Sequence, residues 1–239
     1  MKVIKSLISG IDTLVLSFDA YWTSRAFFEL LNGKLEEAKA LKEEVPFSLV
    51  EPDGNVIHFM LKPHGAGGYA WLLIGNDYCL KIMDAVRPES RPNLMVEFRS
   101  EFLWAVGPLQ AVTRIIDALE CIGVELPVRK PSRVDLCKDL LVAEEGWTLD
   151  ILNYAVTKAT IDDTHRKHQQ MTGITFGRKA LVARLYDKTR EIREVSGKTW
   201  FYKLWELEEL PENTLALRVE FQLRRATLRE LGCNASKFS

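Results

Sequence analysis

The sequence predicts an α+β fold of two related β-α-β-β-β-α units, in which antiparallel sheets are flanked by helices. Stretches of alternating apolar and polar residues, typical of half-buried strands, occur in both halves of the 239-residue chain. In each half the first such strand is followed by a segment with apolar residues at helical spacing. We expect one unit over residues 1–126 and another over residues 131–239, joined by the proline-containing link 126–131.

The composition indicates a globular, cytoplasmic protein. Hydrophobic residues make up 47% of the chain and charged residues 27%, as in ordinary folded proteins. Because the formal net charge is −1, any basic surface for nucleic acid must be local. The four cysteines lack CxxC spacing, which argues against a zinc site and favours reduced thiols. No run approaches about 20 apolar residues, so we expect no secretory signal and no membrane contact.

The first half is predicted to contain a long helix, a series of hairpins and a second helix. Residues 11–19 alternate as a strand, and residues 24–44 have helical spacing and a charged, solvated face. Prolines and glycines divide the following chain into short strands. These strands are residues 47–50, 56–61, 69–74, 78–84 and 94–99. The second helix begins at Pro108 and ends before Gly123.

The second half is predicted to contain three strands with one apolar and one polar side. These strands are residues 133–139, 181–188 and 215–223. Helices are predicted after Thr148, over residues 200–210 and from Thr227, and residues 161–170 are a polar loop, either solvated or close to a phosphate backbone. We expect the apolar sides of the strands to face a helical layer and the polar sides to be presented outward.

The polar sides of these strands gather a tyrosine, basic residues and carboxylates. They carry Arg184, Tyr186, Lys188, Asp135, Asp139, Arg218 and Glu220. Carboxylates are the ligands that hard divalent cations prefer, and such a cation polarises a phosphate for attack. Asp135 and Asp139 lie roughly 13 Å apart on a regular strand, so only one would join Glu220 as a ligand unless the strand is bulged.

Tyr186 is the predicted nucleophile of this site. An unperturbed tyrosine titrates near ~10, so Lys188, Arg184 or a metal must favour its phenolate near neutral pH. Lys188 and Arg184 would also stabilise the phosphate charge in the transition state. Attack on a phosphodiester would leave a phosphotyrosine link.

Three blocks of the chain resemble the Rep_trans family of replication initiation factors. The blocks are residues 132–139, 173–188 and 218–223. This family includes rolling-circle plasmid initiators, relaxases of conjugative elements and filamentous-phage replication proteins. The resemblance implies a Rep-like nicking domain that cuts and rejoins one DNA strand at an origin, with Mg²⁺ or Mn²⁺ and a 5′-phosphotyrosine at Tyr186.

The resemblance also implies the partners of the protein. They are single-stranded or melted origin DNA, a second copy in a homodimer and a host helicase. On this interpretation the DNA contacts come from Arg133, Arg178, Lys179 and Arg218. An alternative is a nucleic-acid-binding module that keeps the same fold and catalyses nothing.

A relaxase with histidine-ligated metal is a further alternative, which the sequence excludes. The histidines are His58, His64, His165 and His168, and they show no His-x-His spacing. Any metal must therefore be held by carboxylates.

Short internal repeats are the basis for predicting two related units. Residues 10–19 match 133–139, residues 74–84 match 176–187, and residues 96–98 match 219–221. Met83 then occupies the place of Tyr186. We therefore expect the first unit to shape the sheet or bind DNA without running the same chemistry.

Overall fold

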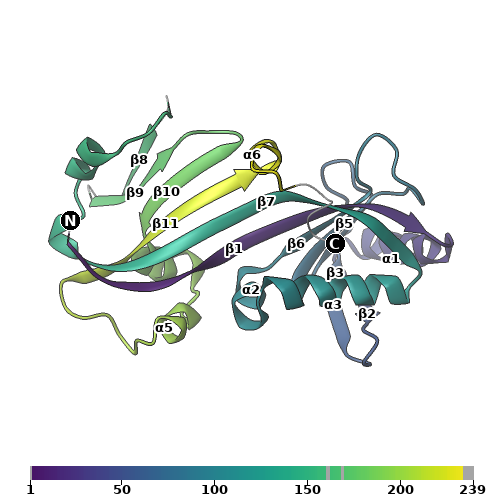
Figure 1. The fold of residues 1–239 in the computed structure, drawn as a ribbon. Coiled ribbons are helices and arrows are strands. Elements are labelled where there is room, and N and C mark those ends of the chain that lie inside the picture. The colour runs from purple at the N-terminus through teal and green to yellow at the C-terminus, as the bar shows by residue number, and fades with distance from the viewer. Residues whose placement is uncertain (1, 160–161, 168–169, 234–239) are drawn as a thin grey trace. The chain divides into compact units, whose positions relative to one another are not determined.

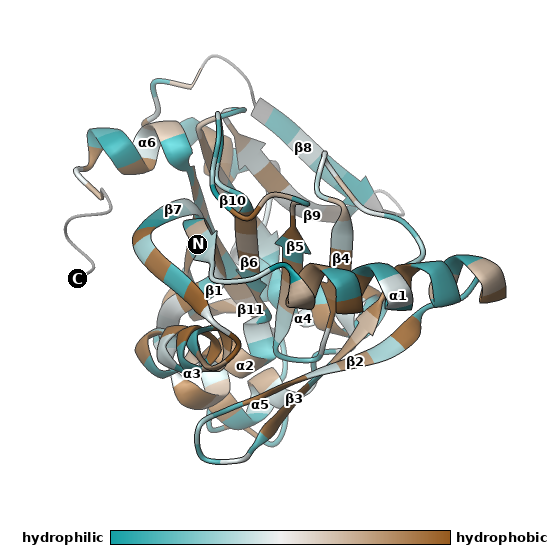
Figure 2. Ribbon diagram, turned by 90° about the vertical axis from the view of Figure 1, so that its right-hand side faces the viewer, coloured by the Kyte–Doolittle hydropathy of each residue, from teal (hydrophilic) through white to brown (hydrophobic). Residues whose placement is uncertain are grey.

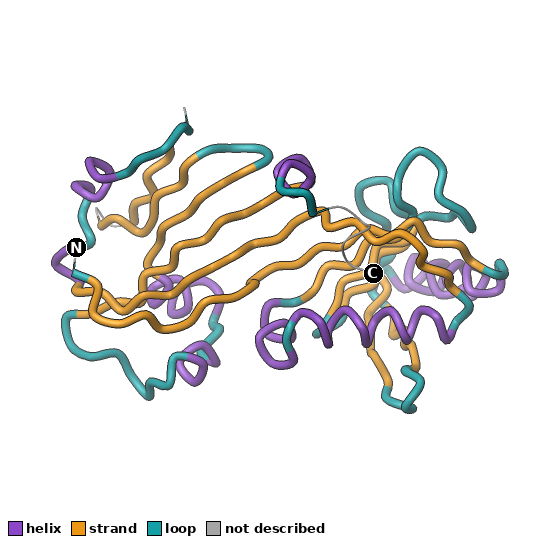
Figure 3. Tube along the Cα trace, viewed as in Figure 1, coloured by secondary structure: helices purple, strands orange, loops and turns teal. Residues whose placement is uncertain are grey.

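The computed structural model describes residues 2–159, 162–167 and 170–233 (Figure 1), and these divide into two compact units. One unit contains residues 11–134 and 228–233, and the other contains residues 2–10 and 135–227. Two strands of 20 residues each contribute to both units, β1 (Val3–Trp22) and β7 (Val124–Ala143). Figure 3 shows both as continuous strands. The predicted link 126–131 therefore lies inside β7, and the units divide at Val134.

The unit of residues 11–134 combines hairpins with three helices. Its strands are β2 (Val45–Val50), β3 (Val56–Leu61), β4 (Trp71–Ile74), β5 (Tyr78–Ile82) and β6 (Leu94–Phe98). Its helices are α1 (Ala26–Leu41), α2 (Ser100–Val106) and α3 (Pro108–Cys121). The predicted start and end of the last helix are confirmed, because Pro108 opens α3 and Gly123, at φ 79°, follows it.

The core of this unit lies between its strands and the apolar sides of α1 and α3. Phe28 and Leu31 of α1 and Ile115 of α3 are buried together with the inward side chains of the strands. The ring of Phe28 lies 4.9 Å from that of Trp22 and 5.2 Å from that of Trp71. Burial of each large side chain contributes roughly 1.5–3 kcal/mol, which holds the helices on the strands.

The unit of residues 135–227 holds the strands that the sequence predicts to be functional. Its further strands are β8 (Asp162–Lys167), β9 (Gln170–Phe176), β10 (Leu181–Asp187) and β11 (Thr214–Arg224). Its helical segments are two 3-10 helices (Glu144–Gly146 and Leu149–Tyr154), α4 (Lys188–Glu191), a π-helix (Ile192–Ser196) and α5 (Trp200–Leu204), and α6 (Arg225–Glu230) begins within it.

Residues 162–167 form strand β8, although the sequence predicts a polar loop over 161–170; residues 161, 168 and 169 lie outside the described residues. In Figure 2 β8 is mostly hydrophilic. It is the last strand in the hydrogen-bonded order, and a polar edge strand of this kind disfavours pairing with other chains.

All strands belong to one sheet. Their hydrogen-bonded order is β2-β3-β4-β5-β6-β1-β7-β11-β10-β9-β8, and the sheet is antiparallel. Of the described residues, 43% are in strands and 29% in helices, so helices are too few to flank the strands of each half. The predicted α+β fold of two β-α-β-β-β-α units with sheets flanked by helices, a Rep-like nicking domain, is therefore wrong.

The polar sides of β7 and β11 are buried, whereas the sequence predicts that they are presented outward. Asp139 and Arg218 are 0% exposed and Glu220 is 7% exposed. On the other side of the same strands, Leu136 is 42% and Phe221 45% exposed. The prediction that these polar side chains face outward is wrong, because α5 and the residues next to it cover them. Trp205 donates to Asp139, and the ring of Phe201 lies against Arg218.

Candidate functional site

Tyr186, Arg184 and Glu220 form one hydrogen-bonded group on β10 and β11. The phenol of Tyr186 donates to Oε2 of Glu220 at 3.0 Å. The guanidinium of Arg184 donates to Oε1 of Glu220 at 2.8 Å and to Oε1 of Gln222 at 2.7 Å. The sequence prediction that a tyrosine, a basic residue and a carboxylate meet on one side of the sheet is therefore confirmed for these residues.

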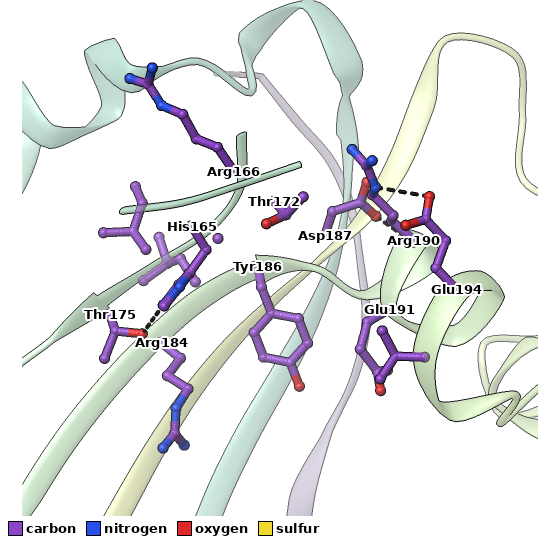
Figure 4. Close-up of a pocket in the computed structure, with 14 residues that line it drawn as sticks. His165, Arg166, Thr172, Thr175, Arg184, Tyr186, Asp187, Arg190, Glu191 and Glu194 are labelled. Carbon is purple, nitrogen blue, oxygen red and sulfur yellow. Dashed lines mark hydrogen bonds and ion pairs between the residues drawn. The ribbon is translucent and has the colours of Figure 1, made fainter. Parts of the chain in front are cut away.

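The strand register explains why these side chains meet. β10 and β11 are antiparallel, and Arg184 lies opposite Glu220 while Tyr186 lies opposite Arg218. Residues two apart on a strand point to the same side, so Arg184 and Tyr186 share a side with Glu220. Figure 4 shows both side chains extending from β10 in the same direction.

Arg218 and Asp139 form a fully buried ion pair beside this group. The guanidinium of Arg218 donates to Oδ1 of Asp139 at 2.6 Å and to Oδ2 at 2.8 Å. The indole of Trp205 adds a hydrogen bond to Oδ2 at 2.9 Å. Both ions are 0% exposed, so Arg218 joins two strands inside the unit and does not present a DNA contact.

Lys188 is buried directly after β10 and contacts two aromatic rings. Its ammonium lies 4.7 Å from the ring centroid of Phe201 and 5.9 Å from that of Tyr186. Nζ also donates to Glu191 at 2.5 Å. The guanidinium of Arg218 lies 4.5 Å from the same Phe201 ring, so this ring stands within cation–π range of two cations.

The three predicted metal ligands do not fit a shared metal site as they lie. Both carboxylate oxygens of Asp139 accept from Arg218, and each oxygen of Glu220 accepts from Tyr186 or Arg184. Asp135 is buried on β7. Among the residues that the structure describes, no group of three or more histidine, cysteine, aspartate or glutamate side chains is arranged to hold a metal ion.

A cavity of about 470 Å³ opens beside Tyr186. Its wall includes basic side chains that the sequence analysis does not assign to the site, namely His165, Arg166 and Arg190 (Figure 4). His165 lies 2.9 Å from the hydroxyl of Thr175, and Arg190 donates to Glu194 at 3.0 Å. His165 and Arg166 fall in the segment that the sequence predicts to be a polar loop. The sequence does not indicate that this segment pairs as a strand beside β9.

Asp187 links the end of β10 to the start of α4 at the rim of this cavity. Its side chain accepts a hydrogen bond from the backbone N–H of Arg190 at 2.9 Å, which is the geometry of a helix N-cap. Burial raises the pKa of the Asp187 carboxyl, although this hydrogen bond and Arg193 act in the opposite direction.

The remaining predicted DNA-binding residues do not line this cavity. Arg178 and Lys179 lie in the turn between β9 and β10, where Arg178 is 3.3 Å from Asp163. Arg133 lies on β7 in the unit of residues 11–134. They are therefore not part of the Tyr186 group.

The first half of the chain has no tyrosine in the corresponding register position. Cys79 on β5 lies opposite Glu97 on β6, as Arg184 lies opposite Glu220. Two residues further along β5 is Lys81. Lys81, rather than the predicted Met83, therefore matches Tyr186 in this comparison.

Two further findings bear on what the chain is. Within the described ranges no single helix is both long enough and apolar enough to cross a membrane. Only the pair α2 and α3, taken together across a bend of 106°, has that length and composition. Searches against protein-family models, curated proteins and solved structures find no match to this chain.

Proposed function

We propose that this protein nicks and rejoins one strand of DNA, with Tyr186 as the nucleophile. The observation that carries the proposal is the chain of contacts from Tyr186 to Glu220 to Arg184. A nucleophile hydrogen-bonded to a base, which is itself oriented by a third group, is the arrangement of activated nucleophiles in enzymes. The substrate is single-stranded or melted DNA, as the resemblance to replication initiators implies.

The proposed step exchanges one phosphate ester for another. The phenol oxygen of Tyr186 attacks phosphorus and passes its proton to Oε2 of Glu220. The bond from phosphorus to the 3′ oxygen breaks, and that oxygen takes a proton from water and leaves as a hydroxyl, while Glu220 returns its proton to the solvent. The reverse attack by a 3′ hydroxyl releases the tyrosine and rejoins the strand, so no external energy source is needed.

Nearby cations suit the charge that builds up on the phosphate. Arg184 shares the side of β10 with Tyr186, and the ammonium of Lys188 lies 5.9 Å from the tyrosine ring. His165, Arg166 and Arg190 line the adjoining cavity. Cations fixed before the reaction stabilise the pentavalent transition state without further reorganisation.

Denaturing electrophoresis with a labelled single-stranded oligonucleotide tests the proposal. After incubation with Mn²⁺, the wild-type protein should carry the label covalently, and Tyr186→Phe should carry none while binding the oligonucleotide equally well. Tyr202→Phe, in α5, is the matched control and should form the adduct normally. An adduct that persists in Tyr186→Phe would remove Tyr186 from the reaction.

A nucleic-acid-binding module without catalysis is the second candidate. It is favoured by one observation, that both carboxylate oxygens of Glu220 already have donors, as in a purely structural network. In that case the wild-type protein would bind single-stranded DNA but form no adduct on any oligonucleotide.

A further inference from the structure

An exposed apolar surface lies on the other side of the strands that carry Tyr186 and Glu220. Leu136 of β7 is 42% exposed, and Phe221 of β11 and Leu181 of β10 are each 45% exposed. These three strands are neighbours in the order β7-β11-β10. Side chains of this size are usually buried, so their exposure on adjacent strands indicates a binding surface.

The register places these three residues close together. Ala183 lies opposite Phe221 and Leu181 lies opposite Leu223, which makes Leu181 a diagonal neighbour of Phe221. Arg218 of β11 pairs with Asp139 of β7. Counting three residues from Arg218 along β11, and the same distance back along antiparallel β7, brings Phe221 close to Leu136.

A neighbouring part of this side of the sheet is covered. Val142, Leu215 and Leu217 form a buried cluster, and Trp147 packs on it from the 3-10 segment that follows β7. The exposed residues around Phe221 therefore lie beyond the cluster that Trp147 covers.

Two lysines border the exposed part. Lys138 of β7 is exposed on the same side of the strand as Leu136. Lys179 lies two residues before Leu181, in the turn between β9 and β10, and is exposed. Its φ is 66°.

We infer that this surface binds single-stranded nucleic acid, with a base stacked on Phe221 and the backbone phosphates near Lys138 and Lys179. An exposed aromatic ring among cations is the arrangement by which proteins hold single strands without reading their sequence. The basic rim would repel a second copy of itself, whereas it complements a polyanion.

The inference rests on the proposed function for its choice of ligand but not for its site. Phe221 and Tyr186 lie on opposite sides of paired strands, because Phe221 is opposite Ala183 in the register while Tyr186 shares the side of Arg184. Loss of the stacking ring should therefore change affinity for DNA and leave the Tyr186 group intact.

Fluorescence anisotropy with a labelled single-stranded oligonucleotide of mixed sequence tests the inference. Phe221→Ala should weaken binding at least about fivefold, the lower end of the loss for one stacked base, and Phe221→Trp should bind at least as well as wild type. Leu109→Ala is the matched control, because Leu109 is 82% exposed on α3 and lies in the other unit. Its affinity should equal that of wild type.

An oligonucleotide that lacks its bases separates stacking from charge. On this probe Phe221→Ala and wild type should bind alike, while Lys179→Gln should still bind more weakly and depend less on salt. Equal affinity of Phe221→Ala and wild type for the complete oligonucleotide would overturn the inference. So would sedimentation showing a dimer that Phe221→Ala dissociates without any change in DNA affinity.

The two proposals fail separately. If no oligonucleotide becomes attached to Tyr186 but Phe221→Ala still loses affinity, the nicking proposal is wrong and the binding surface stands. If the adduct forms and Phe221→Ala binds as wild type does, the binding surface is wrong and the nicking proposal stands.

Discussion

Glu220 is the residue on which the proposed chemistry depends most, because its carboxylate is the proposed base. It is 7% exposed and accepts hydrogen bonds from both Tyr186 and Arg184. A base held in this way has its geometry fixed before the substrate arrives, which is how enzymes avoid the cost of ordering groups during the reaction.

Glu220→Gln should keep the shape of this group and remove its base. We expect strand cleavage to fall by about 10²–10⁴-fold, the range for loss of general-base catalysis, with DNA affinity unchanged. Single-turnover cleavage measured beside anisotropy checks this expectation. Cleavage at the wild-type rate would exclude Glu220 as the base.

The buried pair of Arg218 and Asp139 is predicted to be structural. Arg218→Met leaves the Asp139 carboxylate buried with only the indole of Trp205, and loss of one buried partner costs about 3–5 kcal/mol of unfolding free energy. Urea denaturation measures this loss.

Two control variants are compared with Arg218→Met in the same denaturation experiment. Arg218→Met with Asp139→Leu removes both charges and should recover most of the stability. Arg25→Met breaks the exposed pair with Asp84, for which about 0–1 kcal/mol is expected. An Arg218→Met variant as stable as Arg25→Met would show that the buried pair contributes nothing.

Residue-level alternation predicts which side chains share a side but not which side is buried. The pattern of β11 correctly groups Arg218, Glu220 and Gln222, yet their side is the covered one. The reason is pairing, because an arginine that meets a carboxylate can be buried as an apolar residue can. No alternation pattern states which distant segment supplies that partner.

Among the elements, the short helix α4 positions the residues next to β10. Asp187 caps it through Arg190, and Lys188 is its first residue. Because burial raises the folded pKa of Asp187, folding favours its protonated form. The resulting stabilisation is fully present below the ordinary aspartate pKa of about 3.9 and is lost as the pH rises through the raised value.

Asp187→Asn should therefore stabilise the protein at neutral pH. Asparagine caps a helix about as well as aspartate and carries no charge to bury. Thermal unfolding should give a higher Tm for Asp187→Asn than for wild type at neutral pH, with the difference vanishing near about pH 3. A lower Tm for the variant at neutral pH would mean that the charge of Asp187 is stabilising.

Elements with strong local signals could be predicted, and elements fixed by distant partners could not. Pro108 and Gly123 mark the ends of α3 in the sequence, and the structure has them there. The prolines of the segment 126–131 indicate a break, yet β7 continues through it because β1 lies alongside, where Lys130 donates to Asp19 at 2.5 Å. Long-range strand pairing of this kind overrides local propensity.

At the scale of the whole molecule, the sequence pattern indicates most strands but not the sheet that they share. Separate sheets are predicted because each half contains its own hairpins and helices. The shared sheet depends on β1 and β7, each of 20 residues and each contributing to both units. The alternation of apolar and polar residues does not state how long a strand is, so the length of these two strands is set by the strands that pair with them.

The proposed function also belongs to the whole molecule, and it depends on a covalent bond at one residue. Trypsin cleaves after lysine and arginine, so it releases Tyr186 within residues 185–188 and Tyr202 within residues 199–203. Mass spectrometry of the digested adduct therefore assigns the attachment directly. We predict that the oligonucleotide is linked through its 5′ phosphate to residues 185–188. Attachment to residues 199–203, or no attachment under any condition in which the DNA binds, would contradict the account.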